Sequence, residues 1–339
     1  MRSSALVVVG LVSMLALSGT VSFSQQAGRA GGAAPPVPNL PVGKTAFWTA
    51  AEIDARWKDN ERLMRPNSRL FNGPTNISAN VRIVMPNDPP LIHETTSDLW
   101  IVTAGTAVAE TDGKVVKVDG KDAMQGSTKR NVKVGDLLYV PPGVPHRFTN
   151  LNGFRAWLMR ADTLGLERTG PAPAPEAPAA GRGRGAAPAA APAAGRGAPA
   201  PPVPDLSTDK TMFWTHEDIV ARWKDDEANK RINSRLYNGP ANISTNVRIV
   251  LPGDPPATHQ GTADLWLVTE GTATAKTDGQ IVNGTIQNGM ERPVHPGDLL
   301  YVPPGVPHHF TDMKGFRAFL IRYDVEGWKQ TRAPAAGAQ

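Results

Sequence analysis

The feature that most constrains the fold of this chain is an internal repeat. Residues 67–90 read NSRLFNGPTNISANVRIVMPNDPP and residues 233–256 read NSRLYNGPANISTNVRIVLPGDPP, with 19 identities in 24 positions at an offset of 166. The twelve residues GDLLYVPPGVPH occur unchanged at 135–146 and at 297–308, an offset of 162. A chain of 339 residues with this pattern predicts two copies of one domain. The four-residue change in offset falls between Gly113 and Gly135, where we expect a longer loop in the first copy.

Composition sets the boundaries of the two copies. Residues 170–202 consist almost entirely of Ala, Pro, Gly and Arg, which is typical of an extended linker, and residues 25–36 and 329–339 are similar tails. Two domains are therefore expected, at 37–169 and 203–328. The formal charge of +5 comes from the leader, tails and linker, whereas the two domains together carry −1. This distribution argues against nucleic-acid binding.

The first 24 residues have the pattern of a secretory signal peptide. Arg2 precedes an apolar run over 5–17, and the small residues Ser22 and Ser24 follow. The run is short for a membrane span of about 20 residues, so we expect cleavage after Ser24 rather than an uncleaved anchor. The expected location is the periplasm or the exterior, with no membrane span after cleavage. The chain contains no cysteine, which excludes disulfides and thiolate metal sites.

Each copy is predicted to begin with a short helix and to continue as β-structure. Thr49 and Glu52, and in the second copy Thr215 and Asp218, have capping-box spacing. Apolar pairs four residues apart follow them, which places both members on one helical face. The later apolar runs are short and bounded by Gly, Pro, Asn or Asp; they are Val81–Val84, Leu99–Val102, Val115–Val118, Leu137–Val140 and Arg155–Met159. Many short strands with frequent turns predict a sandwich or a barrel.

The second repeated motif resembles the C-terminal signature of the cupin superfamily. Gly135, Pro141, Gly143, His146 and Asn150 have the spacing of that signature at every defined position. The second copy has Gly297, Pro303, Gly305 and His308, with Asp312 in place of Asn. The resemblance implies an all-β fold of two tandem cupin barrels (double-stranded β-helix or jelly roll), each with a short N-terminal helix, joined by the Pro/Ala/Gly-rich linker.

The first cupin motif is present in reduced form. The family pattern is His-x-His, four residues, Glu, six residues, Gly. Here the first histidine is replaced by Leu91 or Ala257, and Glu is shortened to Asp. The resemblance then implies one metal site in each barrel, with these ligands: His93, Asp98 and His146; His259, Asp264 and His308. Two imidazoles and one carboxylate suit Fe, Mn, Cu or Zn with coordination positions left open.

Two classes of function follow from this reading. The first is a metal-dependent enzyme, of oxidoreductase, dioxygenase or lyase type, acting on a small oxygenated substrate. The alternative is a non-catalytic module that binds a sugar, an organic acid or a metal ion, with the aspartate holding the histidines together. No catalytic residue is assigned. Four repeated arginines beside the motifs are candidates for holding a substrate carboxylate: Arg69, Arg82, Arg235 and Arg248. Packing of the barrels on each other, or a homo-oligomer, is left open.

Overall fold

The computed structural model describes residues 37–72, 78–86, 88–162, 166–168, 202–238, 243–324 and 328–330. The predicted signal peptide 1–24, the tail 25–36, the linker up to residue 201 and the tail beyond residue 330 lie outside the described residues. All described residues belong to one compact unit of the chain, 33–339. Within them, no helix has the length and apolar character that a bilayer crossing requires.

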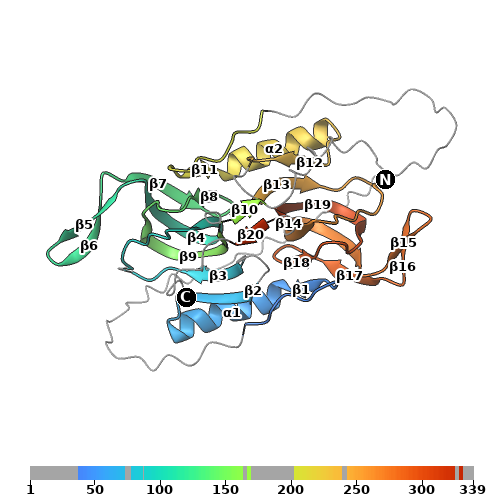
Figure 1. Ribbon diagram of the computed structural model, residues 1–339, viewed down its shortest axis with the longest axis horizontal. Helices are drawn as coiled ribbons and strands as arrows, with labels where there is room; N and C mark the ends of the chain where they lie inside the picture. Colours follow the sequence, from blue (N-terminus) through green and yellow to red (C-terminus); the bar gives the residue numbers. More distant parts are fainter. Residues whose placement is uncertain are drawn as a thin grey trace, which may run out of the picture. The chain divides into compact units, whose positions relative to one another are not determined.

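Both repeats have one helix followed by a series of strands (Figure 1). The elements of the first repeat are β1 (Ala46–Trp48), α1 (Ala50–Leu63), β2 (Asn67–Asn72), β3 (Ser78–Ile83), β4 (Thr96–Thr111), β5 (Lys114–Val118), β6 (Lys121–Gln125), β7 (Thr128–Lys133), β8 (Leu137–Val140), β9 (His146–Asp162) and β10 (Leu166–Arg168). Those of the second are β11 (Met212–Trp214), α2 (His216–Ala228), β12 (Asn233–Arg235), β13 (Ile243–Ile249), β14 (Thr262–Thr277), β15 (Gln280–Val282), β16 (Thr285–Gln287), β17 (Met290–Val294), β18 (Leu299–Val302), β19 (His308–Asp324) and β20 (Trp328–Gln330).

Two seven-stranded antiparallel sheets carry the fold. One has the order β11-β8-β4-β9-β3-β2 and the other β1-β18-β14-β19-β13-β12, with β7 and β17 added on β4 and β14. In each sheet the two long strands, β4 with β9 and β14 with β19, pair along nearly their whole length with three register shifts. Such irregularities bend long strands, so each pair can contribute to both faces of a barrel. The prediction of two mostly β domains, each preceded by a short helix, is confirmed.

The helix starts are those that the sequence predicts. Thr49 caps α1, and its side chain accepts from the Glu52 backbone N–H while the Glu52 carboxylate accepts from the backbone of Thr49. Thr215 and Asp218 form the same capping box at α2. The apolar pairs on each helix, Ile53 with Trp57 and their counterparts, are buried against the sheets.

The two repeats exchange their first strands. β1 pairs antiparallel with β18 of the second repeat, and β11 pairs with β8 of the first. The short strands β10 and β20, near the end of each repeat, also pair with each other. The packing that the sequence left open is therefore present, and it is reciprocal. A three-residue strand has too little periodicity to reveal its partner, so the sequence could not show this exchange.

The GDLLYV motif of each repeat contacts the N-terminus of the helix of the other repeat. The Asp136 carboxylate accepts from the backbone N–H of His216 (2.7 Å) and of Lys133 (2.9 Å). It thereby joins the start of α2 to the turn between β7 and β8. Asp298 does the same for Ala50 (2.7 Å) and His295 (2.8 Å). The preceding Gly135 has φ of +88°, and a Cβ there would lie 2.2 Å from the His216 ring. A glycine at this position is thus required by both the turn and the close approach.

We expect Asp136→Ala to lower the free energy of unfolding by about 2 kcal/mol, because two backbone donors lose a buried charged acceptor. Asp136 is 2% exposed. The matched control is Glu217→Ala, which removes an exposed salt bridge to Lys133 and should change stability much less, because water screens that pair. Urea unfolding of the three proteins measures the difference. Equal stabilities of the two variants would contradict this role of Asp136.

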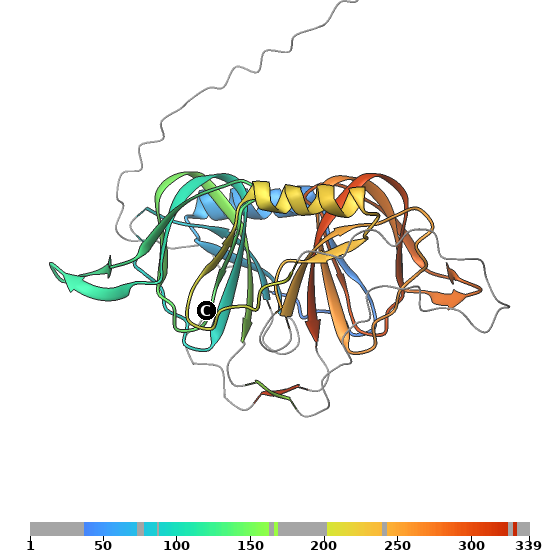
Figure 2. The ribbon, with the colours of Figure 1, turned by 90° about the horizontal axis from the view of Figure 1, so that it is seen from above.

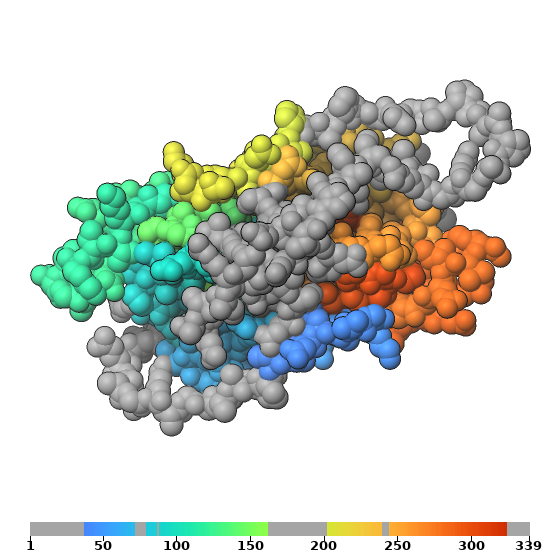
Figure 3. Space-filling model, viewed as in Figure 1, coloured from blue at the N-terminus to red at the C-terminus, as the bar shows by residue number. Residues whose placement is uncertain are grey.

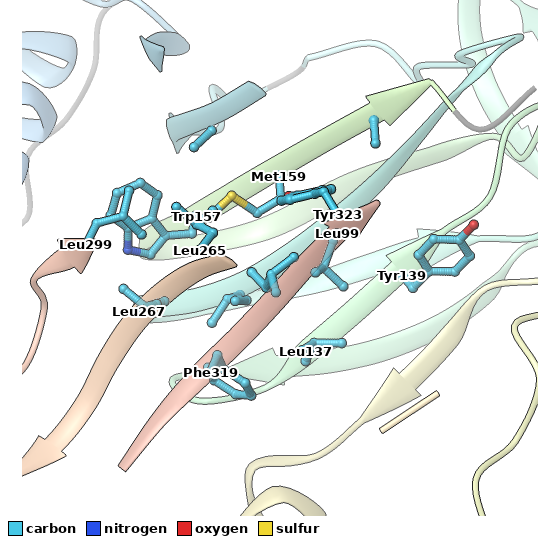
Figure 4. Close-up of a cluster of buried hydrophobic side chains, with 14 of the residues drawn as sticks. Leu99, Leu137, Tyr139, Trp157, Met159, Leu265, Leu267, Leu299, Phe319 and Tyr323 are labelled. Carbon is cyan, nitrogen blue, oxygen red and sulfur yellow. The ribbon is translucent and has the colours of Figure 1, made fainter. Parts of the chain in front are cut away.

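Successive side chains of the barrel strands point to opposite faces of the sheet and pack into two different hydrophobic cores. In β4, Trp100 and Val102 belong to the core of the first barrel, whereas Leu99 and Ile101 belong to a larger cluster made by both repeats. Figure 4 shows that cluster, in which side chains from β4, β8 and β9 lie beside side chains from β14, β18 and β19. Burial of both faces explains why the strand sequences LLYV and LWIV are continuously apolar rather than alternating.

The extra residues of the first repeat form a longer hairpin. β5 and β6 span 114–125, whereas β15 and β16 span 280–287, a difference of four residues. This confirms the prediction of an extended loop between Gly113 and Gly135. Each hairpin is a two-stranded sheet separate from the large sheets and extends from its own barrel (Figures 2 and 3). Its length can therefore vary without disturbing the long strands.

One buried acid distinguishes the two helices. Asp226 in α2 is fully buried, and burial raises its pKa to about 6 although Ser234 donates to it. Its second carboxylate oxygen is buried without a hydrogen-bond partner. The equivalent residue of α1 is Asn60, whose side-chain amide donates to the Val81 carbonyl (3.2 Å). An amide at this position therefore satisfies the site better than a carboxylate does.

We expect Asp226→Asn to stabilise the protein above pH 6. The net gain should be about 1 kcal/mol, because the substitution also weakens the contact with Arg231. Since the folded pKa is above that of the unfolded chain, wild-type stability falls as pH rises from about 4 to about 6. The benefit of the asparagine should therefore disappear near pH 4. Chemical unfolding at pH 4 and pH 8 measures this, and a benefit that does not depend on pH would contradict it.

Candidate metal centre

The two cupin motifs meet at one end of each barrel. In the first repeat, the turn residue Gly143 donates its N–H to the carbonyl of His93 (2.7 Å). His146, the first residue of β9, exchanges two backbone hydrogen bonds with Leu91 (2.9 and 3.0 Å). Asp98 lies near the start of β4, between Val140 on β8 and Arg160 on β9. The glycine-proline turn thus holds the His93 segment against β9.

The three predicted ligands of the first barrel converge. The Asp98 Oδ2 atom lies 3.5 Å from His93 Nε2 and 3.3 Å from His146 Nε2. The side chains of Asp98 and His146 are buried, and that of His93 is 15% exposed. Ligand atoms about 2.1 Å from one ion lie roughly 3–3.5 Å apart when they occupy neighbouring coordination positions. The spacing of these atoms therefore suits a metal ion.

The second barrel repeats this geometry. The Asp264 Oδ2 atom lies 3.6 Å from His259 Nε2 and 3.4 Å from His308 Nε2. In both barrels all three ligand atoms lie within 4.8 Å of one another. Both sites are therefore candidate 2-His-1-carboxylate metal sites, and neither one is degenerate relative to the other.

Each site also contains an arginine that was not predicted from the sequence. Arg160 on β9 donates from Nε to Asp98 Oδ1 (2.9 Å), and its Nη2 lies 2.8 Å from His93 Nε2. Arg322 on β19 makes the same contacts with Asp264 (3.0 Å) and His259 (2.9 Å). Two signals in the sequence could have revealed these arginines. Each is a cation within an otherwise apolar strand, and the two are 162 residues apart, as are the two copies of GDLLYVPPGVPH.

These contacts fix the charge of the site. Burial alone would raise the pKa of Asp98, but the Arg160 guanidinium and the two imidazoles lower it well below its ordinary value. Burial, helped by Arg160, lowers the pKa of His93 to about 4. In the second site, burial lowers the pKa of His308 to about 4, and Arg322 lowers that of Asp264 despite burial. At neutral pH the carboxylates are ionised and these two imidazoles are neutral, as metal ligands must be.

The histidine orientations also fit a metal. His146 Nδ1 lies 3.2 Å from the Val144 carbonyl, which can only accept, so the ring proton is on Nδ1 and the Nε2 lone pair points into the site. That Nε2 atom is buried without a hydrogen-bond partner, as is Asp264 Oδ2 in the second barrel. Arg160 likewise requires His93 Nε2 to be an acceptor. Each barrel thus has one buried ligand atom without a hydrogen-bond partner, and a cation could accept its lone pair.

The four arginines predicted from the repeats lie in the surrounding structure. Arg82 is 9% exposed and lies 3.8 Å from Asp88. Burial and the nearby Arg160 lower the pKa of its guanidinium. Burial and Arg160 also lower the pKa of Arg69. In the second repeat, Arg235 donates to Asn238 (3.2 Å) and the Arg248 guanidinium lies 5.7 Å from the Trp266 ring centre. Their assignment to substrate binding remains a prediction.

Comparison with known proteins agrees with the geometry. The cupin domain model matches residues 247–318, within the second repeat. Among solved structures, salicylate 1,2-dioxygenase from Pseudaminobacter salicylatoxidans superposes with a TM-score of 0.53 at 15% identity, over 85% of this chain and 86% of that one. A variant of that enzyme with gentisate gives 0.50 at 14% identity, over 86% and 83%. Among curated proteins, none matches this chain significantly in sequence.

The motifs, the matched domain model and the two-barrel fold lead to one assignment. The superposition covers both repeats and, at this level of identity, concerns the fold alone. The domain model and the repeated motifs place the same family signature in each half. The second repeat matches the cupin domain model, and the chain has the fold of two cupin-type barrels in tandem.

Proposed function

We propose that each barrel binds one divalent transition-metal ion and that the protein is a metal-dependent enzyme of oxidoreductase or lyase type, acting on a small oxygenated substrate. The observation that carries this proposal is the convergence, twice in one chain, of two histidine nitrogens and one aspartate oxygen within 4.8 Å. The residues that would hold the ion are His93, Asp98 and His146, and their counterparts 259, 264 and 308. Fe, Mn, Cu and Zn all accept this donor set.

The protein supplies rigid, correctly charged ligands. Val144 orients His146, and Arg160 donates to both oxygens of Asp98 (2.9 and 3.3 Å), of which Oδ2 also faces the histidines. Three protein ligands leave several positions for substrate or water. When bound, the ion would act as a Lewis acid or activate dioxygen. The Trp100 ring packs edge-on against His146, with the ring centres 6.3 Å apart.

A second candidate function has its own support. Arg160 satisfies Asp98 and His93 by hydrogen bonds alone, and Arg322 does so in the other barrel. A guanidinium in this position can replace the charge of a metal ion. That observation favours a non-catalytic module that binds an organic acid or a sugar.

Metal content separates the two candidates. Protein incubated with Fe, Mn, Cu or Zn and then desalted should hold two ions per chain, one per site. His93→Ala should hold one and His93→Ala/His259→Ala none, because each change removes a ligand. The matched control is His295→Ala, an exposed histidine outside both sites, which should keep two ions. Absence of metal from wild-type protein with all four ions would reject the enzyme proposal.

We also propose that the protein acts outside the cytoplasm, in the periplasm or after secretion. The support is the leader pattern over residues 1–24. The intact mass of protein recovered from the periplasm or medium of an expressing bacterium tests this. The expected N-terminus is Gln25, and full-length protein confined to the cytoplasm would contradict the proposal.

A further inference from the structure

The arginine in each site has two acceptors, and only one of them is compatible with metal binding. Arg160 Nη2 uses the lone pair of His93 Nε2. An imidazole nitrogen has one lone pair, so His93 cannot accept from Arg160 and ligate an ion at the same time. The bond from Arg160 Nε to Asp98 Oδ1 has no such conflict, because the carboxylate has a second oxygen. Arg160 Nη2 also donates to Asp98 Oδ2 (3.3 Å), so in a loaded site only the N–H released from His93 would need another acceptor.

Charge points to the nature of that acceptor. With an ion present, each pocket would hold two charges from the ion and one from the arginine, against one negative charge from the aspartate. Arg82 adds a nearly buried cation whose partner, Asp88, is 3.8 Å away. Asp98 is 1% exposed, so water screens this excess poorly. A buried excess of positive charge is stabilised by an anion held between the cations.

We propose that Arg160 and Arg322 form the carboxylate-binding half of the substrate site, so that each barrel takes a small carboxylate held jointly by the guanidinium and the metal ion. This inference rests on the proposed function. A planar carboxylate has two oxygens, and the guanidinium fork matches that geometry. Arg82 and Arg248 add positive charge around the pocket but are not required to touch the ligand.

The arginine makes the same contacts in both sites, which supports this proposal. Arg322 contacts Asp264 and His259 within 0.1 Å of the distances of the first site, 3.0 against 2.9 Å and 2.9 against 2.8 Å. An arginine that served only to neutralise Asp98 would need no contact with the histidine. Its position between the carboxylate and a metal-ligating nitrogen places its donor beside the coordination positions that the protein leaves open.

The test is the coupling between Co(II) and acetate, with neutral acetamide as the control ligand. Calorimetry of Co(II) binding should show a gain in affinity of about tenfold or more in saturating acetate and none in acetamide. In Arg160→Lys/Arg322→Lys the gain should fall at least about threefold, because lysine keeps the charge for Asp98 but lacks the fork. The same substitution outside the sites, Arg155→Lys/Arg317→Lys, changes arginines that pair with surface acids and should leave the gain unchanged.

The outcomes separate this inference from the proposed function. Co(II) binding with equal effects of acetate and acetamide, or with a gain unchanged in the lysine variant, would overturn the carboxylate site and leave the metal proposal standing. If neither Co(II) nor any of Fe, Mn, Cu and Zn binds, the metal proposal fails. Line broadening of ¹³C-acetate by metal-free protein then decides: broadening that is lost in the lysine variant supports the subsite, and no broadening overturns it.

Discussion

Asp98→Ala will lower the free energy of unfolding by about 3–5 kcal/mol in metal-free protein, because it leaves the Arg160 guanidinium without a counter-charge in a buried pocket. Asp98 is 1% exposed and the Arg160 side chain 14%. The double variant Asp98→Ala/Arg160→Met should recover most of the loss, since it removes both charges. Urea unfolding of the wild type, of Asp98→Ala, of Arg160→Met and of the double variant gives the coupling free energy directly.

The pH dependence of this effect has a definite sign. Arg160 and the histidines hold the pKa of Asp98 below its ordinary value despite burial. A carboxylate with a lowered folded pKa contributes stability above the unfolded pKa of about 4, and that contribution is lost as the pH falls further. The deficit of Asp98→Ala relative to wild type should therefore be full at pH 7 and shrink below pH 4.

An acid of helix α1 that pairs with another arginine of β9 provides the control. Asp54 pairs with Arg155 of β9 at 3.3 Å, and its side chain is 41% exposed. Asp54→Ala should lower the free energy of unfolding far less than Asp98→Ala, because water screens the pair. A cost for Asp98→Ala no larger than that for Asp54→Ala would show that the buried ion pair does not stabilise the site.

The contrast between these two arginines shows which part of the site a sequence can reveal. His93, Asp98 and His146 occupy motif positions, and the glycine and proline turns around them have fixed spacings, so their convergence was predictable. Arg160 belongs to no motif. It is placed by pairing with Asp98 across β4 and β9, and such register depends on bulges that the sequence does not mark.

The exchange of first strands was unpredictable for a different reason. The strand that carries Phe47 is three residues long, and its neighbours are as compatible with its own barrel as with the other one. What decides the partner is the capping of Ala50 by Asp298 and the space left by Gly297, both distant in the sequence. The sequence repeat correctly indicates two copies of the domain. It does not indicate which copy supplies the first strand of each sheet.

This exchange predicts that residues 37–169, expressed alone, form a homodimer. Without the second repeat, β8 lacks β11, Asp136 lacks its helix N-terminus, and one side of the shared core is exposed. Because the exchange is reciprocal, a second copy can supply every missing part through its own β1 and α1. Light scattering should therefore give about twice the mass of one repeat. Burial of a large apolar surface should keep the dimer intact at micromolar concentration.

Phe47→Asp distinguishes strand exchange from other association in that isolated repeat. Phe47 lies on β1, packs against the core of the opposite barrel and lies beneath the Arg292 guanidinium, 5.3 Å from its ring centre. A carboxylate at this half-buried position cannot make the apolar contacts of the Phe47 ring, so the change should dissociate or strongly weaken the dimer. Val118→Asp, on the exposed hairpin, introduces the same charge far from the exchanged strand and should leave the dimer intact. A folded monomer of the unmodified repeat, stable at high concentration, would mean that each barrel closes on its own strand, and the exchange would then be dispensable to the fold.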